Sequence, residues 1–227
     1  MLSLLMAAVF FAVIHVGVSG TRVRDGLVRS VTLRGYMIGY SVVSVAGIVW
    51  LISAYRGAEY QPLWVAPEAW KLVADVLMLP AFMLVVIGLA TPNPTAVAQE
   101  RLAEQAPRGI VQVTRHPFLM GVALWAVLHL VSNGDVASVL FFGTFALVAL
   151  AGAPSIDAKR RRSLGAATWD AFASRTSIVP FGAIAARRAG FDAGAIGWWR
   201  IGIGVLAYVL FIGGHRHIIG VSPFPHW

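Results

Sequence analysis

Residues 117–156 read PFLMGVALWAVLHLVSNGDVASVLFFGTFALVALAGAPSI, which is two apolar runs joined by the short polar segment 132–135. His129 is the only titratable side chain of residues 117–134, and residues 136–156 contain none. About 20 apolar residues in an α-helix cross the hydrocarbon core of a bilayer, and the helix satisfies its own backbone hydrogen bonds there. The turn residues Ser-Asn-Gly-Asp between the two runs therefore predict a hairpin of two transmembrane helices.

Four further segments have the same character, so the sequence predicts about six spans. Across the chain, 58% of the residues are hydrophobic and 12% are charged, with a mean hydropathy of +0.76. A water-soluble domain carries about 25% charged residues, so this composition excludes an ordinary soluble protein. We expect an all-α transmembrane bundle that forms one domain over residues 1–227, without internal repeats. The four segments are residues 1–21, 35–54, 72–91 and 196–214.

The basic residues predict the orientation of this bundle. Of the 18 Lys and Arg residues, 15 fall on one side of a six-span topology, and only Arg56, Lys71 and Arg216 fall on the other. Basic loops stay in the cytoplasm, which places both termini on the non-cytoplasmic side, most simply of a bacterial inner membrane. The net charge of +8 then reflects topology and contact with anionic lipid, and it does not indicate a nucleic-acid partner. The oligomeric state leaves no signal in the sequence.

A short amphipathic segment precedes the last span. In residues 164–175, the side chains of Leu164, Thr168, Trp169 and Phe172 fall on one helical face, directly after the basic run 159–162. A basic flank beside an apolar aromatic face is typical of a helix that lies in the membrane interface. We therefore predict an interfacial helix at this position.

Two histidines, His15 and His129, fall well inside predicted spans. An ionisable residue at that depth is costly and indicates function, although a neutral histidine can also serve only to bond a neighbouring helix. Neutral imidazole is a good ligand for haem iron, and a helical bundle can hold a cofactor between facing helices. The sequence has no cysteine, which excludes thiolate ligands and disulfides.

Three further residues are candidates for cofactor binding. Arg115 and His116 open the fourth span, where they can meet a lipid headgroup or an anionic cofactor, and His215 follows the sixth span. The alternative interpretation of each is an ordinary polar boundary of a membrane helix. A helix rises 1.5 Å per residue, so His15 and His129 are expected to differ in depth by about 10 Å. These depths favour two layers, with His15 near His116 and His129 near His215.

Several blocks of the sequence resemble the NnrU family, which also contains a plant 15-cis-zeta-carotene isomerase. The resemblance implies a polytopic membrane protein and a haem b held by histidines, with His15 and His129 as the matching ligand candidates. It also implies either cis–trans isomerisation of a hydrophobic polyene or a link to denitrification and nitric oxide metabolism. Ala126 stands where the plant enzyme has a cysteine. The blocks are Ile14-His15-Val16-Gly17 with Ser19 and Leu33-Arg34, residues 114–126 with His129-Leu130 and Asn133-Gly134-Asp135, and residues 215–223.

Two other functions remain open from the sequence. Residues 115–121, RHPFLMG, are similar to a signature of isoprenylcysteine and phospholipid methyltransferases, which use S-adenosylmethionine. However, Leu119 replaces the tyrosine of that signature, and residues 157–160, DAKR, replace its acidic pair. The second alternative is a non-enzymatic membrane factor that supports assembly or regulation of a respiratory complex, in which the histidines would be structural.

Overall fold

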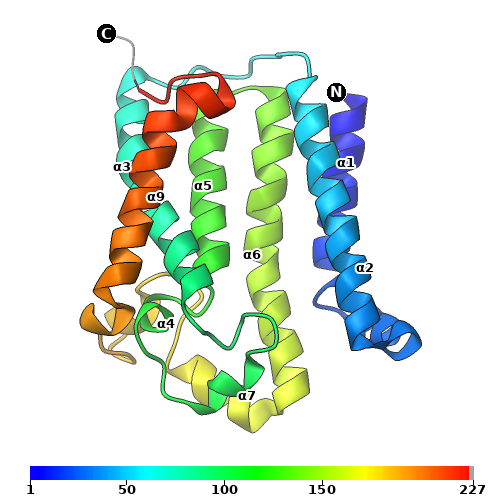
Figure 1. Ribbon diagram of the computed structural model, residues 1–227, viewed down its shortest axis with the longest axis vertical. Coiled ribbons are helices and arrows are strands. Elements are labelled where there is room, and N and C mark those ends of the chain that lie inside the picture. Colours follow the sequence, from blue (N-terminus) through cyan, green and yellow to red (C-terminus); the bar gives the residue numbers. More distant parts are fainter. Residues whose placement is uncertain (225–227) are drawn as a thin grey trace.

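A computed structural model describes residues 1–224 of the chain, and within them six long helices run side by side as a bundle (Figure 1). Named β-strands are absent from these residues. The prediction of an all-α bundle is therefore confirmed. The long helices are α1 (Leu2–Ala12), continued by the π-helical turn η1 (Val13–Val18), α2 (Arg22–Arg56), α3 (Glu68–Ala90), α5 (Pro117–Asn133), α6 (Val136–Leu164) and α9 (Trp198–Ile219).

The six apolar helices correspond to the six predicted spans. Helices α2, α3, α6 and α9 are long and apolar enough to cross a membrane, and the helical stretches Leu2–Val18 and Pro117–Asn133 are apolar but shorter. The predicted hairpin between α5 and α6 is also present. Gly134 ends α5 with a φ of 68°, and the Asp135 side chain caps α6 by accepting a hydrogen bond of 3.0 Å from the Ser138 amide. The chain is thus an integral membrane protein.

Both ends of the described chain lie at the same end of the bundle. Met1 and the C-terminal end of α9 are at the top of Figure 1. Most basic residues lie at the opposite end, because α2 begins there at Arg22, α3 ends there, and α6 ends there with its run of residues 159–162. We call this the basic end. The expected segregation of charge between the two ends is therefore present.

Helix α2 begins earlier than predicted, within the expected loop. Val31 and Thr32 leave helical geometry, Thr32 with a φ of 64° and a ψ of 163°. Non-glycine residues rarely adopt a positive φ, so this point is a sharp break in the helix. It separates the basic first part of α2 from the apolar part that crosses the bilayer.

Short helices close the basic end of the bundle. They are η2 (Glu100–Glu104), α4 (Ile110–Val113), α7 (Ala166–Ser174), α8 (Gly182–Ala185) and η3 (Gly194–Ile196). Helix α7 occupies the position of the predicted amphipathic helix. Its Trp169 and Phe172 are only 2% and 1% exposed, and they pack in a core cluster with Ile87, Met120 and Ala153. The apolar face that we expected in the membrane interface is therefore covered by the protein itself.

Two glycines let α3 and α5 approach closely. A Cβ atom added at Gly121 would lie 2.8 Å from the Ala81 carbonyl oxygen and 2.8 Å from the Val85 amide nitrogen. A Cβ atom at Gly88 would lie 2.8 Å from the Phe118 amide nitrogen. Membrane helices associate mainly through such close packing, so these positions set the distance between α3 and α5.

The substitution Gly121→Ala should destabilise the protein by about 1–3 kcal/mol, because the added methyl group collides with the backbone of α3. The measurement is the free energy of unfolding in detergent micelles. Gly39→Ala is the matched control, since no atom lies within 4 Å of its added Cβ. The control should be neutral or slightly stabilising, as alanine favours helix more than glycine. Equal losses in the two variants would contradict the packing argument.

Candidate functional site

The structure brings together His129 of α5 and His215 of α9. Their ring centroids are 6.4 Å apart, and their ring planes differ by 23°. This proximity agrees with the pairing that the depths of the two residues predict. The two helices come from distant parts of the sequence, and both carry the histidine near the end of the bundle that holds the termini.

Each of these histidines has one ring nitrogen occupied by a backbone carbonyl. His129 Nδ1 lies 2.9 Å from the Trp125 oxygen, and His215 Nδ1 lies 2.8 Å from the Val221 oxygen. A neutral imidazole bonded in this way carries its proton on Nδ1 and leaves the Nε2 lone pair free. Within residues 1–224, neither Nε2 atom has a hydrogen-bond partner. This is the arrangement that metal-ligating histidines adopt.

Aromatic rings surround His129. Its ring stacks on Phe142 of α6 at a centroid distance of 4.8 Å and lies 5.0 Å from Trp125. This apolar packing holds the orientation of the imidazole and excludes water from one of its faces. The sequence contained a signal for this feature, because Trp125 lies one helical turn before His129 on the same face.

His15 has the same hydrogen-bond pattern but a different environment. Its Nδ1 lies 2.8 Å from the Phe11 oxygen, and its ring contacts Phe11 and Tyr40 at centroid distances of 4.1 and 5.6 Å. It lies in the π-helical turn η1, a rare geometry that often marks functional sites. Within the described residues, no ring contact or hydrogen bond joins His15 to His129, His116 or His215, so the predicted layer of His15 with His116 is absent, and His116 instead meets Asp157.

Aromatic side chains separate His15 from His129. Phe145 of α6 contacts Phe11 at 5.6 Å and Trp125 at 5.5 Å. Because Phe11 covers His15 and Trp125 covers His129, a layer of rings fills the space between the two histidines. Groups of three or more His, Cys, Asp or Glu residues that could hold a metal ion are absent from residues 1–224.

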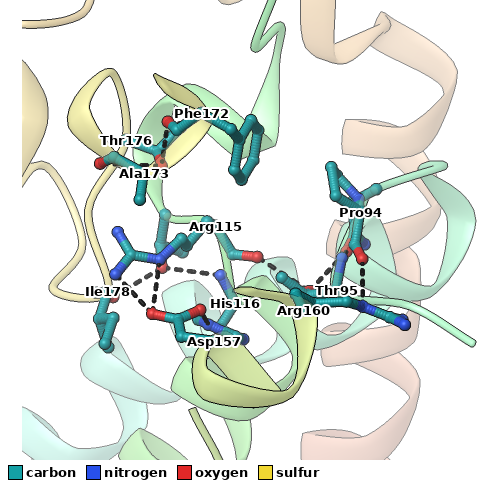
Figure 2. Close-up of polar contacts among 12 residues, drawn as sticks. Pro94, Thr95, Arg115, His116, Asp157, Arg160, Phe172, Ala173, Thr176 and Ile178 are labelled. Atoms are coloured by element: carbon teal, nitrogen blue, oxygen red, sulfur yellow. Dashed lines mark hydrogen bonds and ion pairs between the residues drawn. The ribbon is translucent and has the colours of Figure 1, made fainter. Parts of the chain in front are cut away.

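Arg115 and His116 form a separate polar cluster with Asp157 of α6 (Figure 2). Arg115 donates to Asp157 Oδ2 from Nε at 3.0 Å and from Nη2 at 2.6 Å. His116 Nε2 lies 2.7 Å from Asp157 Oδ1. A carboxylate can only accept hydrogen bonds, so the proton of a neutral His116 ring is on Nε2. We call these three residues the Asp157 cluster.

The Asp157 cluster is largely buried. The His116 side chain is fully covered, and the side chains of Arg115 and Asp157 are 12% and 15% exposed. Burial lowers the pKa of His116 below its ordinary value, although the Asp157 carboxylate opposes this shift. Arg115 and His116 are thus held by an internal carboxylate, whereas the sequence analysis placed them at the surface facing a ligand.

The cluster connects segments that are far apart in the sequence. Thr114 Oγ1 donates to the Ile178 carbonyl at 2.7 Å, and Thr95 Oγ1 donates to the Arg115 carbonyl at 2.9 Å. Asp157 was missed as a partner by the sequence analysis. The sequence did contain a signal for this role, because Asp157 is the one acidic residue beside the basic run 159–162.

Comparison with known proteins gives one family and one curated relative. A sequence model of the family described as NnrU protein matches residues 3–223. The chain is 25% identical over 197 residues to the protein named "15-cis-zeta-carotene isomerase, chloroplastic" from Arabidopsis thaliana, an alignment that covers 80% of this chain and 50% of that protein. The chain thus spans about half the length of the curated relative that it matches. No solved structure matches the chain.

Asp157→Asn should destabilise the protein by about 3 kcal/mol, because it leaves the Arg115 charge without its carboxylate in a largely buried position. The free energy of unfolding in detergent measures this loss. Asp170→Asn is the matched control, since Asp170 pairs with Arg161 where both side chains are more than half exposed. The control should change stability little. A small effect of Asp157→Asn would show that the cluster does not hold α5 to α6.

Proposed function

This chain belongs to the NnrU family, and we propose that it binds haem b in the membrane through intramembrane histidines, with His129 as one iron ligand. The observation that carries the proposal is the pair His129 and His215, whose ring centroids lie 6.4 Å apart and whose Nδ1 atoms bond to backbone carbonyls. Two imidazoles that bind one iron from opposite sides have their nitrogens about 4 Å apart, because each Fe–N bond is about 2 Å, and their ring centroids about 6 Å apart, because each centroid lies roughly 1 Å behind its nitrogen. The spacing of the pair fits this requirement.

Two histidines compete for the second ligand position. Geometry favours His215, because it already lies beside His129 and presents a free Nε2. The family resemblance favours His15, which also has a free Nε2 but lies behind Phe145. Binding by His15 would require the aromatic layer between α1 and α5 to rearrange, whereas binding by His215 would not.

The chemistry that we propose is cis–trans isomerisation of a hydrophobic polyene. A bound haem would supply a redox-active iron that acts on the double bond, and the family's plant relative is named as an isomerase of such a substrate. The chain's own residues hold and orient the imidazoles. Helix α9 leaves many of its apolar side chains exposed, among them Val209 at 53% and Phe211 at 50%, so a substrate dissolved in the bilayer would reach the pair from the lipid.

The alternatives are less well supported by the geometry. In the methyltransferase hypothesis, Arg115 and His116 would contact the methyl donor, but both side chains are engaged by Asp157. The assembly-factor hypothesis treats the histidines as structural, yet three of them leave Nε2 free. The link to denitrification rests on the family resemblance alone.

The test is an absorption spectrum of the detergent-purified protein, oxidised and reduced, from cells supplied with a haem precursor. We expect a Soret band and sharp reduced bands, which His129→Ala should abolish. Loss of the spectrum in His215→Ala but not His15→Ala would assign the second ligand to His215, and the reverse result would assign it to His15. His217→Ala, an exposed position on the same helix α9, is the matched control.

A folded protein that is colourless and takes up no added haem would remove the proposal. Binding of S-adenosylmethionine would then be the next measurement, because it separates the methyltransferase hypothesis from a non-enzymatic factor. Histidine variants that fold and still complement a deletion strain would favour the non-enzymatic factor.

A further inference from the structure

A basic cavity of about 270 Å³ lies at the basic end of the bundle, away from the histidine pair. It is formed where the first turn of α2, the 3-10 helix η2 and the C-terminal end of α6 meet. These three segments are remote in the sequence, so the fold alone creates the cavity. The lining residues are Arg24, Asp25, Glu100, Lys159, Arg160, Arg162 and Ser163.

Positive charge exceeds negative charge in this cavity. Four cationic side chains face two carboxylates, and Asp25 is shared between Arg24 at 3.3 Å and Arg162 at 4.0 Å. Lys159 has neither a hydrogen bond nor an ion pair among residues 1–224 and is only partly exposed. Like charges gathered at a partly buried position repel one another. The cavity therefore carries an excess of positive charge.

Two of the cavity's arginines, Arg160 and Arg162, are held in place by backbone carbonyls. Arg160 donates from Nε to the Pro94 oxygen at 2.9 Å, as Figure 2 shows, and also to the Ala96 oxygen. Arg162 donates to the Gly20 oxygen at 2.8 Å. Side chains that are already held in one conformation lose little entropy when a ligand arrives. Arg160 and Arg162 are thus preorganised for binding.

One acceptor in the cavity lacks a donor. Glu100 Oε2 is buried and lies 3.4 Å from Arg160 Nη1, but it makes no hydrogen bond within the described residues. A buried oxygen without a donor is unfavourable. The Glu100 side chain as a whole is 37% exposed and lines the cavity, so its carboxylate can accept a hydrogen bond from a ligand that carries a hydroxyl or ammonium beside an anionic group.

We propose that this cavity binds a phosphate group with an adjacent hydrogen-bond donor, either the headgroup of an anionic phospholipid or a free phosphate. Lys159 and the neighbouring arginines contact the phosphate oxygens, which suits the preference of these cations for phosphate. Glu100 accepts the hydrogen bond from the donor, such as a headgroup hydroxyl or a protonated phosphate oxygen. The site is independent of haem, so the proposed function can fail without affecting it.

The experiment is a thermal unfolding titration of the full-length protein in detergent. In one arm the protein is titrated with inorganic phosphate, and sodium chloride at equal ionic strength is the control. In the other arm phosphatidylglycerol is added to the micelles, and phosphatidylcholine is the control. We expect a ligand-dependent rise in the unfolding midpoint of about 5 °C near saturation. A rise with phosphatidylglycerol alone assigns the site to lipid, and a rise with phosphate alone assigns it to a soluble ligand.

Variants of the cavity residues test whether the rise in the unfolding midpoint depends on this cavity. Lys159→Gln and Arg24→Gln should each remove most of the rise, while Arg161→Gln should keep it, because Arg161 lies on the same helix but pairs with the exposed Asp170. Lys159→Gln should not lower the midpoint of the ligand-free protein, since it removes an unbalanced charge. No rise in either arm, or an unchanged rise in both cavity variants, would overturn the proposal.

Discussion

The carboxylate of Asp157 is the point on which the arrangement of the bundle depends. It accepts hydrogen bonds from Arg115 and from His116, and so it joins α6 to the two residues that directly precede α5. Pro117 follows at once and starts α5, as proline does well in a first helical turn. The direction and register of α5 are therefore set at the basic end. His129 lies 13 residues beyond His116, about 20 Å further along the helix, where it meets α9.

This arrangement separates two kinds of polar group along the bundle. Near the basic end, Asp157 pairs with Arg115 and His116, while His129 and His215 bond to backbone carbonyls through Nδ1. Between these layers the side chains are aromatic, with Phe145 and Phe142 packed edge-on against Trp125. A histidine that served only to join helices would bond to a neighbouring helix, but His15 and His129 bond to their own helices. Their free Nε2 atoms are thus unexplained by packing alone.

The sequence predicted the features that depend on local composition. Apolar runs and turn residues predicted the six helices, and their even number predicted that both termini share one end. Depth along the helices also predicted that His129 meets His215. Depth restricts which residues can meet, but the specific hydrogen bonds between distant side chains were not predictable, because no local pattern encodes them. Asp157 therefore went unrecognised as the partner of Arg115, and the apolar face of α7 was assigned to the membrane when the core covers it.

The basic cavity and the histidine pair are connected through α6, because α6 carries both Lys159 of the cavity and Asp157, which holds the start of α5. Lys159 lies two residues after Asp157 on α6, and Arg160 is bonded to the loop whose Thr95 holds the Arg115 carbonyl. An anion bound beside Lys159 would remove repulsion at the end of α6 and so strengthen the attachment of α6 to α5. Since His129 is carried by the other end of α5, the anion would act on the histidine pair only through the stability of the helix packing. Its effect should therefore appear in unfolding and leave the environment of His129 unchanged.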